Sequence, residues 1–111
     1  MDEPRAIRLS GLEWEDDVPG IRDRAEVVDG ARWAIVEYAE GASREEWCED
    51  GHRGLVIEGE IEYEFTDGRE RLRARTGDAF LLPGGVGVAH RGRNLAGGPT
   101  TMFLIDDPAA A

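Results

Sequence analysis

The residues best suited to chemistry in this 111-residue chain are its only two histidines and its only cysteine, with a glutamate close by. Glu46 and Cys48 are two positions apart, so on a β-strand their side chains would share one face. His52 follows across a turn at Gly51, and His90 lies further along, after a stretch rich in proline and glycine. A carboxylate, a thiolate and two imidazoles suit zinc, iron or another first-row metal. Glu46, if it is not a ligand, is a candidate general base.

The segment that positions His90 reads GDAFLLPGGVGVAHRGRN over residues 77–94. A short apolar strand meets a Pro/Gly turn, and the histidine is followed four positions later by Asn94. This pattern resembles the second signature of the cupin superfamily, G-x5-P-x-G-x2-H-x3-N, except that two extra residues lie between Gly85 and His90. In cupins this histidine is the final metal ligand and faces into a small β-barrel. Because a displacement of two residues preserves strand parity, we expect His90 to point inward as well.

An earlier stretch is similar to the first cupin signature, G-x5-H-x-H-x3,4-E-x6-G. Gly59 takes the place of its last glycine, which puts His52 at the position of the family's glutamate. Cys48 and Glu46 then fall where the family has its two histidines. The resemblance covers roughly residues 33–105 and implies an all-β fold, a cupin-like jelly-roll β-barrel. It also implies a metal site formed by His52, His90, Cys48 and Glu46 that holds a divalent first-row metal such as zinc, iron, manganese or nickel.

The same resemblance implies a small organic molecule as ligand or substrate in the mouth of the barrel. Aromatic residues that could line this pocket are Tyr63, Trp47 and Phe80. Cupin reactions include those of dioxygenases, isomerases and decarboxylases, and the resemblance does not choose among them. The departure from the two-histidine-plus-glutamate pattern puts dioxygenase activity in particular doubt. The resemblance further implies a homodimer, with the N-terminal arm or an edge strand as the contact.

The residues alone leave alternatives to this metal site open. Cys48 belongs to a type that is often simply buried, and Glu46 lies in the charged run 43–46, which can face water. A site of His52, His90 and waters is one alternative. A barrel without metal, holding a small ligand as a sensor or accessory module, is another. A nucleophilic pair of Cys48 with a histidine is a third, although the spacing does not support it.

Alternating and β-branched patterns predict a set of short strands. The clearest is 60–65, where Ile61, Tyr63 and Phe65 alternate with three glutamates. After a turn at 66–68, residues 69–75 alternate again and set an arginine row beside the glutamate row on the solvent face, which we interpret as structural. Further strands are predicted at 32–39, 45–48, 78–82, 90–94 and 100–105, with a buried run at 55–57 and an edge strand at 6–9.

Composition bounds the class of protein and its partners. The length predicts one domain, with an irregular arm or edge strand over 1–30 that Trp14 anchors, a barrel over 31–107 and a tail over 107–111. The net charge of −11 argues against nucleic-acid or anionic-membrane binding. A single cysteine allows no internal disulfide. Without a signal-peptide pattern or a stretch able to span a bilayer, the expected location is cytoplasmic.

Overall fold

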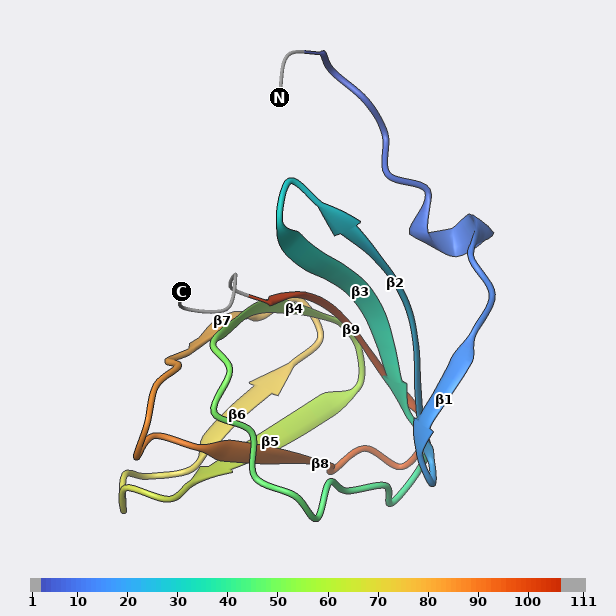
Figure 1. Ribbon diagram of the computed structural model, residues 1–111. Helices are drawn as coiled ribbons and strands as arrows, with labels where there is room; N and C mark the ends of the chain where they lie inside the picture. The colour runs from blue at the N-terminus through green and yellow to red at the C-terminus, as the bar shows by residue number, and fades with distance from the viewer. Residues whose placement is uncertain (1–2, 107–111) are drawn as a thin grey trace.

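The computed structural model describes residues 3–106 and folds them into two antiparallel β-sheets (Figure 1). A 3-10 helix, η1, spans Leu9–Gly11. The strands are β1 (Glu15–Val18), β2 (Ile21–Val28), β3 (Ala31–Tyr38), β4 (His52–Glu58), β5 (Glu60–Phe65), β6 (Leu72–Arg75), β7 (Ala79–Leu82), β8 (His90–Asn94) and β9 (Thr100–Asp106). One sheet has the order β1-β2-β3-β9-β4-β7 and the other β6-β5-β8. Within residues 3–106, no helix has the length and apolarity needed to cross a membrane.

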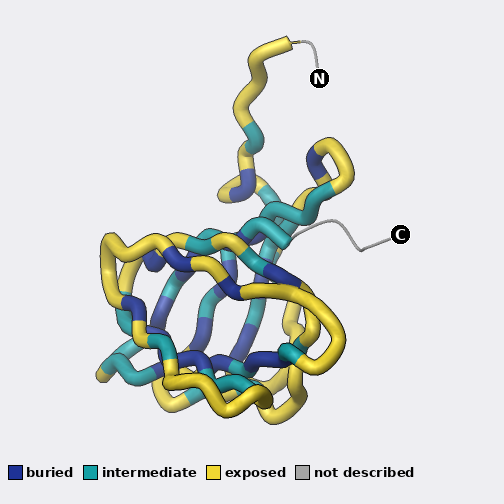
Figure 2. Tube along the Cα trace, turned by 90° about the vertical axis from the view of Figure 1, so that its left-hand side faces the viewer, coloured by how far each residue is buried: buried dark blue, intermediate teal, exposed yellow. Residues whose placement is uncertain are grey.

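The core fills the space between the two sheets, because inward-pointing residues of both contribute to it. Figure 2 shows buried stretches on the strands and exposed stretches on the connecting loops. The alternation predicted for 60–65 is confirmed, since Ile61 and Tyr63 of β5 are buried in this core. The other core residues are Ile21, Ala34, Val36, Tyr38, Val56, Ala74, Phe80, Leu82, Met102 and Leu104.

The outer face of the three-stranded sheet carries the predicted charge ladder, extended by a second arginine row on β8. Glu62 pairs with Arg73 on β6 and with Arg93 on β8, at 2.8 Å to each, and with Arg71 at 3.2 Å. These guanidinium groups cover the Glu62 side chain, although it lies on the outside of the sheet. Because the arginine side chains of these pairs are themselves half-exposed, the pairs stabilise the fold only modestly, and the ladder chiefly fixes strand register.

The N-terminal segment differs from its prediction. Residues 15–28 are not irregular, because β1 and β2 belong to the six-stranded sheet and β2 pairs with β3 along its whole length. The edge strand of this region is β1, and the edge strand expected at 6–9 is absent from the described structure. Trp14 does anchor the arm, since its ring stacks under the guanidinium groups of Arg22 and Arg24 at 4.2 and 4.3 Å. The predicted tail 107–111, and with it the last residue of the predicted barrel, lies outside the described residues.

Two further predictions are wrong. Residues 45–48 do not form a strand, and the backbone of the segment 39–51 pairs with β8 as two isolated bridges, at Ser43 and Cys48. The run 55–57 is not buried as a whole, because only Val56 faces the core while Leu55 and Ile57 are exposed on the other face. An alternating strand at the surface explains this pattern better than a strand buried on both sides.

Asn94 and Gly59, which match the last residue of each signature, lie where strand ends meet. The Asn94 amide donates to the carbonyls of Tyr38, Ala39 and Gly98 at 2.8 to 3.2 Å, and its oxygen accepts from the Thr100 hydroxyl at 2.8 Å. At the β4–β5 turn, Gly59 has φ +106°, and a Cβ there would lie 2.2 Å from the Thr100 hydroxyl oxygen. Only glycine fits this position.

Candidate metal centre

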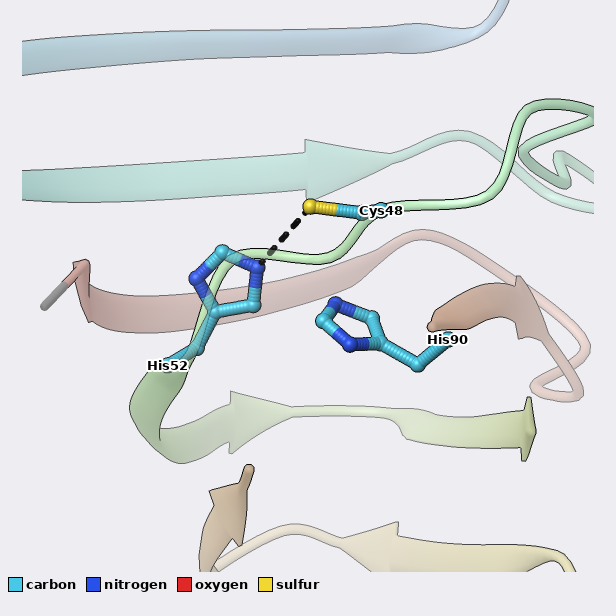
Figure 3. A group of neighbouring side chains, drawn as sticks. All are labelled: Cys48, His52 and His90. Carbon is cyan, nitrogen blue, oxygen red and sulfur yellow. Dashed lines mark hydrogen bonds between the residues drawn. The ribbon is translucent and has the colours of Figure 1, made fainter. Parts of the chain in front are cut away.

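Three side chains with metal-binding atoms converge inside the barrel (Figure 3). His52 is the first residue of β4 and His90 is the first residue of β8, whereas Cys48 lies in the segment that links β3 to β4. The Cys48 sulfur and one ring nitrogen of each histidine all lie within 4.8 Å of one another. The structure thus brings together three of the four residues that the sequence proposes as ligands.

Backbone pairing fixes Cys48 opposite His90. The Cys48 N–H donates to the His90 carbonyl at 2.8 Å, and the His90 N–H donates to the Cys48 carbonyl at 2.9 Å. The rings of His52 and His90 meet edge-on, with centroids 4.8 Å apart. The Tyr63 ring also contacts His90, with centroids 5.7 Å apart and planes almost perpendicular. Each member of the group therefore has a fixed neighbour.

The loop 83–89 absorbs the two extra residues that precede His90. It docks on the segment that carries Cys48: the Gly85 N–H donates to the Glu49 carbonyl at 2.9 Å, and the Gly87 N–H donates to the Glu49 carboxylate at 3.3 Å. Residues 83–87 of this loop are exposed, so the extra length bulges outward and the inward parity of His90 is kept. His90 is 3% exposed and points inward, as its parity predicts.

Asp106, which the sequence did not reveal as a site residue, orients His52. Its carboxylate lies 2.7 Å from Nδ1 of His52, while Nε2 of the same ring lies 3.7 Å from the Cys48 sulfur. The carboxylate therefore holds the Nδ1–H and leaves Nε2 turned toward the Cys48 sulfur. Arg32 in turn lies 3.7 Å from Asp106. The sequence pattern could have indicated Asp106, because it continues the alternation of Met102 and Leu104, which point inward on β9.

Cys48 and His52 contact each other, and each shifts the pKa of the other. Hydrogen bonds from His52 and then His90 lower the pKa of the Cys48 thiol to about 6, against the opposing effect of burial. Burial lowers the pKa of His52, but its hydrogen bonds to Asp106 and Cys48 outweigh this and raise the pKa to about 9. Without a metal, the pair therefore favours thiolate and imidazolium near neutral pH.

The donor set fits a metal ion. Thiolate sulfur and imidazole nitrogen are the ligands that borderline-soft first-row metals prefer. Among residues 3–106, Nδ1 of His90 is buried and has no hydrogen-bond partner. A buried polar atom without a partner is costly and calls for an explanation, and a cation near the group, or a water held by one, would supply it. Cys48, His52 and His90 form a group that could hold a metal ion.

The group lies on the wall of a cavity of about 700 Å³. Two of the three aromatic residues predicted for the pocket, Tyr63 and Trp47, line it. Phe80 does not: it packs in the core against Tyr63, with ring centroids 5.4 Å apart. The walls also carry Tyr38 and Arg44 on one side and Arg32 and Asp106 near His52. The cavity is large enough for a small organic molecule.

Glu46 lines the same cavity but is not part of the three-residue group. Its side chain is exposed, at a bend of the backbone. The expectation that Glu46 and Cys48 share a face rests on a strand at 45–48, and no strand forms there. Glu46 thus lies at the exposed rim of the cavity, outside the group of Cys48, His52 and His90.

Fold and site together define a small jelly-roll barrel with a Cys/His/His group facing its cavity. No protein-family model matches the sequence, and no curated protein matches it. Solved structures do match: KdgF from Halomonas sp. is 25% identical, over 91% of this chain and 90% of that one, with a TM-score of 0.69. An RmlC-like cupin from Shewanella frigidimarina is 21% identical over 97% and 93%, with a TM-score of 0.69. The polyketide cyclase RemF from Streptomyces resistomycificus is 17% identical over 94% and 79%, with a TM-score of 0.73.

The chain has the fold of the cupin superfamily, and the all-β jelly-roll prediction is confirmed. Its Cys/His/His group departs in two ways from the signature that the sequence resembles. A cysteine stands where the family has a histidine, and the histidine at position 52 stands where the family has a glutamate.

Proposed function

We propose that this protein is a metal-dependent cupin that holds one divalent metal ion through Cys48, His52 and His90 and acts on a small organic molecule in the adjoining cavity. The observation that carries the proposal is the convergence of these three donors within 4.8 Å on a cavity wall. Three protein ligands leave room for a further ligand from solvent or substrate, which is typical of catalytic rather than structural sites.

The ligand types favour zinc or iron over manganese, because a thiolate is a soft ligand and manganese prefers oxygen. Zinc is the leading candidate, since it combines readily with sulfur and nitrogen. When bound, such a metal would supply Lewis-acid polarisation of a substrate oxygen.

The chain's own residues have separable roles in this proposal. Asp106 holds the proton on Nδ1 of His52, so that Nε2 is free to bind. Tyr63 packs edge-on against His90 and helps to keep that ring buried. Glu46, exposed at the rim, is the candidate general base for a substrate in the cavity. Trp47 is held at the same rim by Arg91, whose guanidinium stacks on its ring at 4.1 Å.

Metal analysis tests the proposal directly. Protein purified without chelator or histidine tag should contain about one equivalent of metal, and His52→Ala, His90→Ala and Cys48→Ser should each lose it. Glu46→Gln is the matched control, since it alters a cavity residue outside the group and should keep the metal. After exchange with cobalt, a thiolate charge-transfer band should be present in the unaltered protein and absent in Cys48→Ser. The proposal would be refuted if the protein is isolated without metal and takes up neither zinc, iron nor cobalt when these are added.

A second candidate is a metal-free binding module, and one observation favours it. Cys48, His52 and Asp106 already form a connected set, with contacts of 3.7 and 2.7 Å, that is complete without a metal. In that case His52→Ala and Cys48→Ser would leave ligand binding in the cavity intact. The metal analysis separates the two candidates, because only the first requires a bound ion.

A further inference from the structure

The cavity beside the Cys/His/His group is more acidic than the chain as a whole. Eight of its 19 lining residues carry carboxylates and two are arginines, whereas the chain has 24 acidic residues among 111. The formal charge of these lining carboxylates and guanidinium groups is −6. A concave wall of one sign concentrates the opposite charge from solution, so this cavity favours cations and repels anions.

Both arginines of the cavity are already paired with carboxylates of the chain. Arg44 pairs with Asp17 at 2.5 Å. Arg32 pairs with Asp23 at 3.0 Å, and it also lies 3.7 Å from Asp106. A ligand that carries a carboxylate or a phosphate would have to displace one of these side chains from its guanidinium group. The arginines therefore give the cavity no preference for an anionic ligand.

Two exposed carboxylates at the rim of the cavity have no such partner. Glu15 belongs to β1 and Glu46 to the segment that links β3 to β4, and both line the cavity. Across residues 3–106, neither side chain forms an ion pair or a hydrogen bond. Glu46 is two residues from Cys48, so the Cα atoms of these two residues lie at most about 7 Å apart. A small molecule held at the rim can therefore reach the Cys/His/His group.

Strand register points independently to a cation beside Glu15. Glu15 on β1 lies directly opposite Asp23 on β2, and both residues line the cavity. Like charges at directly opposed positions destabilise an antiparallel strand pair. The buried carboxylate of Asp23 is balanced by Arg32, which leaves the charge of Glu15 unbalanced. A cationic ligand beside Glu15 would relieve the repulsion between the two strands.

The buried wall of the cavity offers a polar atom to the other end of a ligand. His90 is 3% exposed and lines the cavity, and its Nδ1 has no hydrogen-bond partner in the described part of the chain. A hydroxyl group would satisfy this nitrogen in either tautomer of the ring, because it can both donate and accept. Trp47, which also lines the cavity and is 42% exposed, adds an aromatic ring of the kind that attracts cations.

We propose that the ligand of this cavity is a small organic amine, whose ammonium group is held by Glu15 and Glu46 and whose other, polar end reaches the Cys/His/His group. The inference rests on the proposed function for the group that the inner end would meet. The preference for a cation depends on the carboxylates of the rim alone. Molecules that carry a carboxylate or a phosphate are disfavoured, because the lining repels them.

Three molecules that differ at one end only test the proposal: 4-amino-1-butanol, 1,4-butanediol and 4-hydroxybutyrate, which are a cation, a neutral molecule and an anion. Their binding to the full chain is followed by NMR through the indole N–H of Trp47, which is assigned from its loss in Trp47→Phe. We expect the amine to bind about 10-fold more tightly than the diol or better, and the hydroxy acid to bind more weakly than the diol. Magnesium chloride, compared with sodium chloride at equal ionic strength, should not displace the amine.

Glu15→Gln combined with Glu46→Gln should weaken amine binding by about 10-fold and leave the diol unaffected, because an exposed ion pair contributes up to about fivefold. Glu26→Gln combined with Glu70→Gln removes the same charge at two exposed positions that do not line the cavity. This second pair should keep amine binding within about twofold of the unaltered protein, because distant exposed charges are screened.

The proposal would be overturned by equal binding of the three molecules, by displacement of the amine by magnesium, or by equal weakening in the two double variants. Metal content is measured on the same samples, so that this inference and the proposed function fail separately. Full metal content without a preference for the amine would overturn the amine assignment alone. A preference for the amine in protein that takes up no metal would overturn the metal site alone.

Discussion

In the metal site proposed above, replacing Asp106 with asparagine should weaken zinc binding, although Asp106 lies outside the group of Cys48, His52 and His90. In the folded protein its carboxylate lies 2.7 Å from Nδ1 of His52. This charge-assisted contact raises the basicity of Nε2 and so makes that nitrogen a stronger metal ligand. Hydrogen bonds to charged groups contribute about 1.5–3 kcal/mol, which corresponds to roughly 10- to 150-fold in affinity. Because the Asp106 side chain is 24% exposed, solvent screens part of this effect, and we expect a loss of about 10- to 30-fold.

Competition with a chromophoric zinc chelator at constant pH measures this loss. Asp23→Asn is the matched control, because Asp23 also pairs with Arg32, at 3.0 Å, but no contact joins it to His52 in the described structure. The control should bind zinc as tightly as the unaltered protein. Equal affinity in Asp106→Asn would refute the orienting role, and equal weakening in both variants would assign the effect to Arg32 instead.

Three further predictions concern the metal-free protein. Alkylation of Cys48 by iodoacetamide should reach half its maximal rate near pH 6, and His52→Ala should move this midpoint upward, since His52 is the main cause of the lowered pKa; an unmoved midpoint would contradict this. The raised pKa of His52 gives stability below pH 6.5 that is lost as pH rises through about 9. The lowered pKa of Cys48 gives stability above pH 9.0 that is lost as pH falls through about 6. Between about pH 6.5 and pH 9, folding takes up one proton at His52 and releases one at Cys48, so the free energy of unfolding measured in urea should vary little with pH. In Cys48→Ser only the His52 effect remains, so the free energy of unfolding should fall as pH rises. Asn94→Ala should lower the free energy of unfolding by about 3 kcal/mol, because it leaves buried carbonyls without donors; a loss below about 1 kcal/mol in urea titrations would show that water replaces the amide.

The strands could be predicted wherever alternation was strict. Over 60–65 the period of two was read correctly, and the arginine row at 71–75 followed from it. The N-terminal strands were missed because β2 mixes charged and apolar residues. Asp23 points inward and forms an ion pair with Arg32, so the inward positions of β2 do not show the apolar alternation that predicts a strand. Such a pairing across strands depends on tertiary structure and leaves no local signal.

Much of the candidate site followed from the sequence because ligand chemistry restricts residue types. The two histidines and the cysteine were identified from type and spacing, and the structure brings them together. Glu46 was placed with them on the assumption of a strand, and the bend at 46 turns its side chain to the rim instead. Asp106 was overlooked because it lies 54 residues from His52, where only the pairing of β4 with β9 brings the two together.

The position of Cys48 depends on β8 more than on its own segment. The segment 39–51 has no regular strand, yet both backbone hydrogen bonds of Cys48 go to His90, so His90 fixes the position of Cys48. The loop before His90 reinforces this, because it holds Glu49, the neighbour of Cys48, through two backbone donors. The two extra residues are therefore not a disturbance of the signature. The loop that they lengthen is bonded to the segment that carries Cys48, so the loop before His90 and the cysteine segment hold each other in place.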